Sequence, residues 1–225
     1  MTFINKSLIL FDLDGTLIDS VPDLAKAINR MLLELGREPF SEEVIRYWVG
    51  NGAQILVKRA LSGDREIDAS IDSTFFEQAL ELFLSFYSQD LCTETKPYPH
   101  VIETVHALNA NGYRLAIVTN KPIEFVRPIL EGVALQNLFE FSLGGNSLEK
   151  KKPDPLPLLY TCQKLEVPVE NAIMVGDSSN DILAAKAANM QSIGVSYGYN
   201  YGEDIDIYSP DIILNDLSEI LLYFR

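Results

Sequence analysis

The chain has 225 residues, of which 47% are hydrophobic and 22% charged, a composition that is ordinary for a soluble globular protein with a sizeable core. Its formal net charge is -14 at pH 7 and its pI is about 4.5. Nucleic acid and anionic membrane surfaces attract Lys and Arg, so an acidic chain without a basic stripe argues against both as partners. The first apolar run is too short for a signal peptide or a membrane span, which favours a cytoplasmic protein.

The first predicted strand is the apolar run Leu8–Leu13, which has the continuous hydrophobic pattern of a strand buried on both faces. From about Asp19 to Cys92 the pattern is helical. Ser20 and Pro22 suit the start of a helix that Gly36 ends. Further helices are predicted over Glu42–Trp48, Ala53–Leu61 and Thr74–Tyr87. We therefore expect an all-helical cap domain, residues 20–92, inserted into a core domain of residues 1–19 and 93–225, with the return hinge at Thr93–Pro99.

Beyond this insertion, short apolar runs alternate with helical patterns. The predicted strands are Leu115–Thr119, Phe139–Leu143, Ala172–Val175, Ile193–Val195 and Ile212–Leu214. The predicted helices between them are Val101–Ala110, Pro155–Leu165 and Asp181–Ala188. Strands that alternate with helices indicate an α/β fold, whose core is a doubly wound, Rossmann-like parallel sheet.

A pair of aspartates ends the first predicted strand, in the sequence Asp12-Leu13-Asp14-Gly15-Thr16. Open α/β sheets bind ligands at the carboxyl ends of their strands, and side chains two apart in a strand share a face. A carboxylate is ionised at neutral pH and is a ready nucleophile once a divalent cation offsets its repulsion from phosphate. The alternative is a turn in which the two aspartates cap backbone groups.

Two further motifs carry groups suited to phosphate. Thr119 ends the next core strand with a hydroxyl, and the backbone N–H groups that follow it, from Asn120 on, can face a phosphate oxygen. Lys152 precedes Pro153, whose ring stiffens the backbone that presents the ammonium. Thr119, Asn120 and Lys152 are therefore candidate phosphate-binding residues. The alternatives are a helix cap at Thr119 and a solvated charge run at 150–152.

The last motif is Val175-Gly176-Asp177-Ser178-Ser179-Asn180-Asp181. Asp177 ends an apolar strand, and Asp181 falls in the first turn of the next predicted helix. Magnesium prefers carboxylate oxygens among protein ligands, so a second strand end that carries a carboxylate completes a metal site beside Asp12. The alternative is helix N-capping by Ser178 or Asp181.

Together and in this order, the four motifs resemble those of the haloacid dehalogenase (HAD) superfamily, in its phosphatase branch. The resemblance covers nearly the whole chain, and the helical insertion resembles that superfamily's cap. It implies that Asp12 is the nucleophile and that Asp14 is the general acid/base. It further implies phosphate binding by Thr119 and Lys152, a Mg²⁺ site formed by Asp12, Asp177 and the backbone carbonyl of Asp14, and support of that site by Asp181.

The similarity is closer still to the phosphoglycolate phosphatase family, in the stretches Val21-Pro22-Asp23-Leu24, Val49-Gly50-Asn51-Gly52-Ala53 and Tyr197-Gly198-Tyr199-Asn200-Tyr201-Gly202. It implies Mg²⁺-dependent hydrolysis of 2-phosphoglycolate, a small anionic phosphate ester, to glycolate and phosphate through an aspartyl-phosphate intermediate. A monomer or a homodimer would suit such an enzyme. Asp154 stands where relatives often have histidine.

The four core motifs recognise phosphate, metal and an ester oxygen, so the choice of substrate must come from the predicted cap. There, Gly50-Asn51-Gly52 precedes a helix, and its backbone N–H groups could meet a substrate carboxylate. Two alternatives stay open. One is a phosphatase or mutase that acts on another small phosphate ester, such as a sugar phosphate. The other is a catalytically inactive module that binds phosphoesters.

Overall fold

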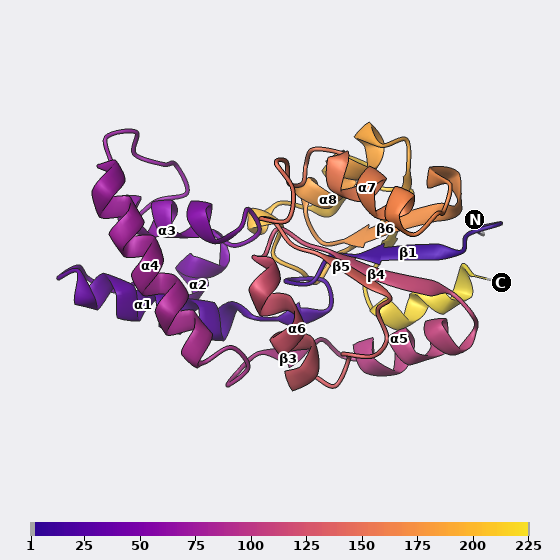
Figure 1. Ribbon diagram of the computed structural model, residues 1–225, viewed down its shortest axis with the longest axis horizontal. Helices are drawn as coiled ribbons and strands as arrows, with labels where there is room; N and C mark the ends of the chain where they lie inside the picture. Colours follow the sequence, from indigo (N-terminus) through magenta and orange to yellow (C-terminus); the bar gives the residue numbers. More distant parts are fainter. Residues whose placement is uncertain (1–2, 225) are drawn as a thin grey trace.

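The computed structural model describes residues 3–224 and is built around a six-stranded sheet with the order β5-β4-β1-β6-β7-β8 (Figure 1). The strands are β1 (Leu8–Phe11), β4 (Arg114–Val118), β5 (Phe141–Leu143), β6 (Ala172–Gly176), β7 (Gln191–Val195) and β8 (Ile212–Leu214). Every neighbouring pair in this sheet is parallel. Because β1 lies between β4 and β6, the sheet grows outward to both sides of the first strand. The predicted doubly wound α/β fold is therefore confirmed.

Both faces of the sheet are covered, as the continuous apolar runs of its strands require. Ile9 and Phe11 of β1 belong to a core on one face, whereas Leu8 and Leu10 belong to a separate core on the other. The first face carries α5 (Val101–Ala110), α6 (Ile123–Gly132) and the 3-10 helix η4 (Leu217–Leu222), and the second carries α7 (Leu156–Lys164) and α8 (Ser179–Ala187) (Figure 1). Short 3-10 turns at η1 (Val169–Asn171), η2 (Asn200–Gly202) and η3 (Ile205–Tyr208) complete the core.

Four helices lie together off one end of the sheet (Figure 1), and in the sequence they fall between β1 and the remaining strands of the sheet. They are α1 (Val21–Glu34), α2 (Glu42–Arg46), α3 (Ala53–Ser62) and α4 (Ser73–Gln89). The helical stretch predicted from the sequence is thus present, while its treatment as a separate cap domain over residues 20–92 stays a prediction. Within residues 3–224, no helix is both long and apolar enough for a membrane span.

A two-stranded antiparallel ribbon joins these helices to the core. It consists of β2 (Ile18–Asp19) and β3 (Lys96–Pro97), with Ile18 paired to Pro97 and Asp19 to Lys96. The segment predicted as a return hinge contains β3. The first turn of α1 fastens this ribbon, because the buried carboxylate of Asp23 accepts hydrogen bonds from the N–H groups of Glu94 and Thr95 and from the Thr95 hydroxyl, at 2.7–3.0 Å. Asp23 therefore links the two segments that join the helices to the core, the one after β2 and the one before β3.

Replacing Asp23 with alanine is expected to lower the free energy of unfolding by about 3 kcal/mol, because it leaves buried donors without an acceptor and removes charge-assisted hydrogen bonds. Urea denaturation followed by circular dichroism measures the change. Glu77→Ala, at an exposed position of α4, is the matched control and should stay within about 0.5 kcal/mol of wild type. Equal stability of the two variants would contradict the role given to Asp23.

Candidate active site

The predicted site residues meet at one edge of the sheet. Asp12 directly follows β1, Thr119 follows β4, and Asp177 follows β6. Since β4, β1 and β6 are neighbours and run parallel, their carboxyl ends bring these side chains together, as expected for a doubly wound sheet. The backbone continues the ladder at this point, with the N–H of Asp12 bonded to the carbonyl of Val175.

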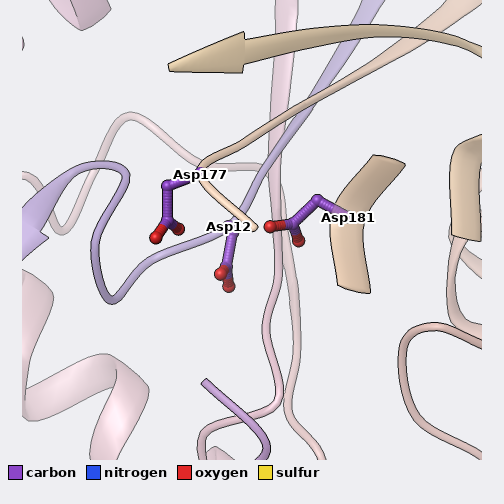
Figure 2. Close-up of side chains that lie close together, drawn as sticks. All are labelled: Asp12, Asp177 and Asp181. Atoms are coloured by element: carbon purple, nitrogen blue, oxygen red, sulfur yellow. The ribbon is translucent and has the colours of Figure 1, made fainter. Parts of the chain in front are cut away.

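Three buried carboxylates gather at this edge, from Asp12, Asp177 and Asp181 (Figure 2). One oxygen from each lies within 4.8 Å of the others. Asp177 is oriented by the Thr16 hydroxyl, which donates to Oδ1 at 3.0 Å, and by the Tyr199 N–H, which donates to Oδ2 at 2.8 Å. Burial, together with the nearby carboxylates of Asp181 and Asp12, raises the pKa of Asp177 well above its usual value. A cluster of hard oxygen donors whose charges repel one another fits a divalent cation.

Glycines make room for Asp177. A Cβ atom at Gly198 would lie 2.1 Å from the Asp177 Cβ, and one at Gly15 would lie 2.4 Å from its Oδ2. Gly15 also has a φ of 87°, which side chains rarely adopt. The backbone therefore closes around this carboxylate on two sides, and no larger residue fits at either position.

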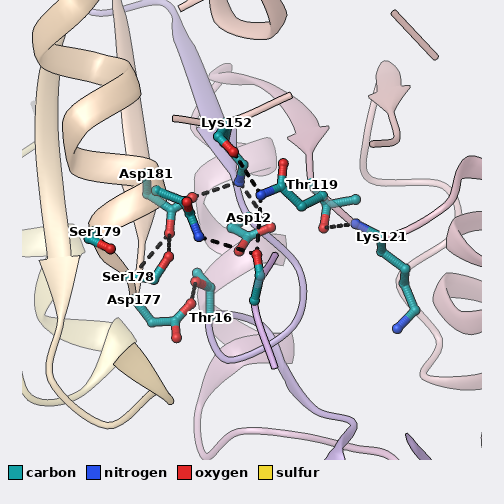
Figure 3. A network of polar contacts seen from close by, with 12 residues as sticks. Asp12, Thr16, Thr119, Lys121, Lys152, Asp177, Ser178, Ser179 and Asp181 are labelled. Carbon is teal, nitrogen blue, oxygen red and sulfur yellow. Dashed lines mark hydrogen bonds and ion pairs between the residues drawn. The ribbon is translucent and has the colours of Figure 1, made fainter. Parts of the chain in front are cut away.

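Lys152 lies inside the carboxylate cluster (Figure 3). Its Nζ is 2.6 Å from Oδ1 of Asp181 and 3.0 Å from Oδ1 of Asp12. Burial raises the pKa of Asp12 to about 6, although the Lys152 charge opposes that rise. Since the Lys152 side chain is buried, the alternative of a solvated charge run is wrong for this residue.

Both carboxylate oxygens of Asp181 are engaged by neighbouring protein groups. Its Oδ2 accepts hydrogen bonds from the N–H and the hydroxyl of Ser178, at 3.0 and 2.9 Å, which caps α8. Its Oδ1 accepts from Lys152. Both oxygens are thus already engaged by protein groups, which suits the supporting role predicted for Asp181 better than direct metal binding.

Thr119 and Asn120 follow β4 and face different partners. The Thr119 hydroxyl accepts a hydrogen bond from the Lys121 N–H at 3.2 Å. The Asn120 side-chain amide donates to the carbonyl oxygens of Lys152 at 3.0 Å and Gly50 at 3.1 Å. Asn120 therefore connects three segments of the site, a structural contribution that its sequence position does not indicate.

Asp14 is held by an interaction that the sequence analysis missed. Its carboxylate accepts hydrogen bonds from Nζ of the buried Lys121, at 2.8 and 3.0 Å, and from the Ser20 hydroxyl at 2.5 Å. The prediction that Ser20 caps α1 with its side chain is wrong, because the hydroxyl is engaged by Asp14 instead. Burial acts to lower the pKa of Lys121, but the neighbouring Asp14 and Tyr87 raise it above its usual value. The sequence does place a lysine at the strand ends, two positions after Thr119, and this was the feature that could have indicated a second cation in the site.

The predicted substrate loop Gly50-Asn51-Gly52 is fastened to the core. The Gly50 carbonyl accepts from the side chains of Asn120 and Asn180, and the Asn51 carbonyl accepts from Lys151 Nζ at 2.7 Å. The Tyr201 hydroxyl donates to the Asn51 side chain at 2.9 Å. These bonds hold the loop over the strand ends.

A small cavity remains between this loop and the strand ends. Its volume is about 40 Å³, enough for a few water molecules. The core contributes Asp12, Asp14, Thr119, Asn120, Lys121, Pro122 and Phe125 to its lining, and the helical insertion contributes Leu24, Val49, Gly50, Gly52, Ala53, Leu56, Phe83 and Tyr87. Residues predicted to carry chemistry thus share one small space with apolar side chains of the insertion.

The sequence of the chain matches a known family. The model of the haloacid dehalogenase-like hydrolases matches residues 9–195, and the chain belongs to this family.

Similar proteins show which kind of hydrolase this chain resembles within the family. The chain is 51% identical to the phosphoglycolate phosphatase of Colwellia psychrerythraea, over 98% of this chain and 97% of that one. It is 49% identical to a phosphoglycolate phosphatase of Pseudomonas putida, over 95% and 78% of the two chains. The crystal structure of a predicted phosphoglycolate phosphatase from Haemophilus somnus superimposes with a TM-score of 0.90 at 40% identity, with 97% of each chain covered. The protein is therefore a phosphatase.

The close approach of Gly198 to Asp177 allows a test of whether a divalent cation binds at this carboxylate. Gly198→Ala is expected to displace Asp177 and to weaken divalent-cation binding on the order of 10-fold or more, as loss of groups that orient ligands does. Isothermal titration with Mg²⁺ or Mn²⁺ measures the affinity without turnover. Gly112→Ala is the control. A Cβ there meets nothing within 4 Å, and the strain expected from its φ of 86° falls before the start of β4, at the opposite end of that strand from Thr119, so this variant should bind the cation as wild type does. Unchanged affinity in Gly198→Ala would argue that the cation does not bind at Asp177.

Proposed function

We propose that the protein hydrolyses 2-phosphoglycolate to glycolate and phosphate through an aspartyl-phosphate intermediate on Asp12. The observation that carries the proposal is the buried cluster in which Asp12 lies beside Lys152 and within reach of Asp177 and Asp181. In this proposal Asp12 is the nucleophile, Lys152 is the cation that faces the phosphate, and the carboxylates provide oxygen ligands for a metal, all at the same edge of the sheet. Carboxylate nucleophiles of this kind form covalent intermediates that divide a difficult displacement into two easier ones.

In the first step, a carboxylate oxygen of Asp12 forms a bond to phosphorus while the bond from phosphorus to the ester oxygen breaks. Asp14 donates a proton to that oxygen, and glycolate leaves as an alcohol. In the second step, Asp14 takes a proton from water, whose oxygen bonds to phosphorus as the acyl-phosphate bond to Asp12 breaks. Phosphate leaves and both carboxyl groups return to their starting states. Lys152 and the Thr119 hydroxyl stabilise the charge on the transferring group.

We propose Mg²⁺ as the cation, held by Asp12, Asp177 and the backbone carbonyl of Asp14, with Asp181 as support. When bound there, the ion would neutralise charge between the carboxylate and the phosphate. The carboxylates of Asp12 and Asp177 are buried oxygen donors that lie close together, which suits a hard cation. Lys152 orients the carboxylates of Asp12 and Asp181 through its contacts with both.

Two observations support phosphoglycolate among small phosphate esters. The relatives at 51% and 49% identity bear that substrate in their names. Side chains of the helical insertion also line the cavity beside the strand ends, so they are placed to limit the size of the leaving group. In this proposal the helical insertion is a cap, residues 20–92, and its loop Gly50-Asn51-Gly52 contributes to substrate choice.

Asp12→Asn is expected to abolish turnover because an amide is a poor nucleophile. Phosphate release is measured for wild type and variant over a panel that contains 2-phosphoglycolate, sugar phosphates and p-nitrophenyl phosphate, with and without Mg²⁺. Wild type should prefer 2-phosphoglycolate and need the cation. Asp206→Asn, an exposed carboxylate, should behave as wild type. Substantial release by purified Asp12→Asn would refute the nucleophile, and a preference for a sugar phosphate would refute the substrate.

The loop is tested at Gly52, which has a φ of 83° and lies so close to the core that a Cβ would be 2.8 Å from the Asn120 carbonyl oxygen. Gly52→Ala is expected to shift the loop and to lower kcat/KM for 2-phosphoglycolate by on the order of 10²-fold, with a smaller loss for p-nitrophenyl phosphate. Gly63→Ala, at the other end of α3 with a φ of 69°, is the matched control. Equal losses on both substrates would show that the loop does not select the substrate.

A further inference from the structure

The two buried lysines of the site lie against different parts of it. Lys152 contacts Asp12 and Asp181, where the phosphoryl group is transferred in the proposed reaction. Lys121 contacts Asp14 instead, and its side chain extends away from Asp12 (Figure 3). Among the described residues that line the cavity, Lys121 is the one with a positive charge. The cation in the cavity is therefore placed beside the group that meets the leaving oxygen.

The surroundings of Lys121 are largely apolar. Leu24, Leu56, Phe83 and Phe125 line the same cavity, and the Lys121 Nζ is 4.9 Å from the centre of the Tyr87 ring. The Tyr87 hydroxyl is buried and has no hydrogen-bond partner among residues 3–224. An ammonium and an unpartnered hydroxyl thus face a space whose wall on the side of the helical insertion is largely apolar.

We propose that Lys121 and the Tyr87 hydroxyl bind the carboxylate of the substrate's leaving group and thereby select an anionic leaving group over a neutral one. This inference rests on the proposed function. Lys121 comes from the core and Tyr87 from α4 of the helical insertion, so the pair is complete when the insertion lies over the strand ends.

The connectivity of the substrate supports this assignment. In 2-phosphoglycolate a single methylene separates the ester oxygen from the carboxylate carbon. A group that contacts Asp14, the proposed proton donor to that oxygen, is therefore within reach of the carboxylate. The Lys121 Nζ, 2.8 and 3.0 Å from the two Asp14 oxygens, satisfies this requirement. Entry of a carboxylate into apolar surroundings is unfavourable without such a partner.

A purely structural role for Lys121, in which it only positions Asp14, makes a different prediction. Asp14 acts on every substrate of the enzyme, so loss of its partner would slow all of them alike. A role in binding the carboxylate affects only substrates that carry one. The comparison of two substrates of similar size, one anionic and one neutral in the leaving group, separates the two roles.

The experiment compares 2-phosphoglycolate with 2-hydroxyethyl phosphate, in which a hydroxymethyl group replaces the carboxylate. Lys121→Met is expected to lower kcat/KM for 2-phosphoglycolate about 100-fold more than for 2-hydroxyethyl phosphate, since a site built around a charged partner discriminates strongly. Tyr87→Phe should change the same ratio by about 10-fold or more, the value of one hydrogen bond to a charged group. Lys164→Met, at an exposed position at the end of α7, is the matched control with an unchanged ratio.

Because both substrates are assayed on one preparation, their ratio does not depend on the fraction of enzyme that is folded. Lys121→Gln provides a second neutral variant for the same measurement. An unchanged ratio in the Lys121 variants overturns the assignment of Lys121, and an unchanged ratio in Tyr87→Phe overturns that of Tyr87. A wild-type enzyme without preference for 2-phosphoglycolate contradicts the proposed function itself, and this result is distinguishable because it appears before any substitution is made.

Discussion

The burial of several carboxylates at one edge of a parallel sheet is the constraint on which the rest of the site depends. Asp12, Asp177 and Asp181 are removed from water and lie close to one another, an arrangement that is unfavourable unless opposite charge is near. Lys152 offsets part of the repulsion through two ion pairs. The excess of negative charge that remains disposes the cluster toward a divalent cation. The glycines around Asp177 and the hydrogen bonds to Asp181 hold the carboxylates in place despite their repulsion.

The site also contains two separate lysine–aspartate pairs. Asp12 and Asp14 are two residues apart, yet each has its own buried lysine, Lys152 for the former and Lys121 for the latter. In the proposed reaction, one pair serves the phosphoryl group and the other serves the leaving group. Asn120 links the two regions through its bonds to the Lys152 and Gly50 carbonyls. The geometry around Asp14 therefore depends on the same backbone that presents Lys152, the lysine proposed to bind phosphate.

The sequence predicted the sheet well because its central strands β1 and β6 are apolar runs that are followed by an aspartate, Asp12 after Phe11 and Asp177 after Gly176. It was less informative where structure depends on distant contacts. The α6 helix was not predicted, since it contains Pro128, and β2 and β3 are too short to show any periodicity. The capping role of Ser20 was wrong because the Asp14 carboxylate competes for its hydroxyl. Nothing local to Lys121 shows which way its side chain extends, so its pairing with Asp14 needed the fold.

The pairing of β2 with β3 bears on how this fold can be altered. Ile18 lies opposite Pro97 and Asp19 opposite Lys96, so the chain leaves the core and returns to it at points about one strand spacing apart, ~5 Å. Removing everything between them would leave two ends that a tight turn can join, without a change in the register of the six-stranded sheet. If the helical insertion selects the substrate, as proposed, this ribbon is the place where a different selecting element would be joined to the same sheet edge.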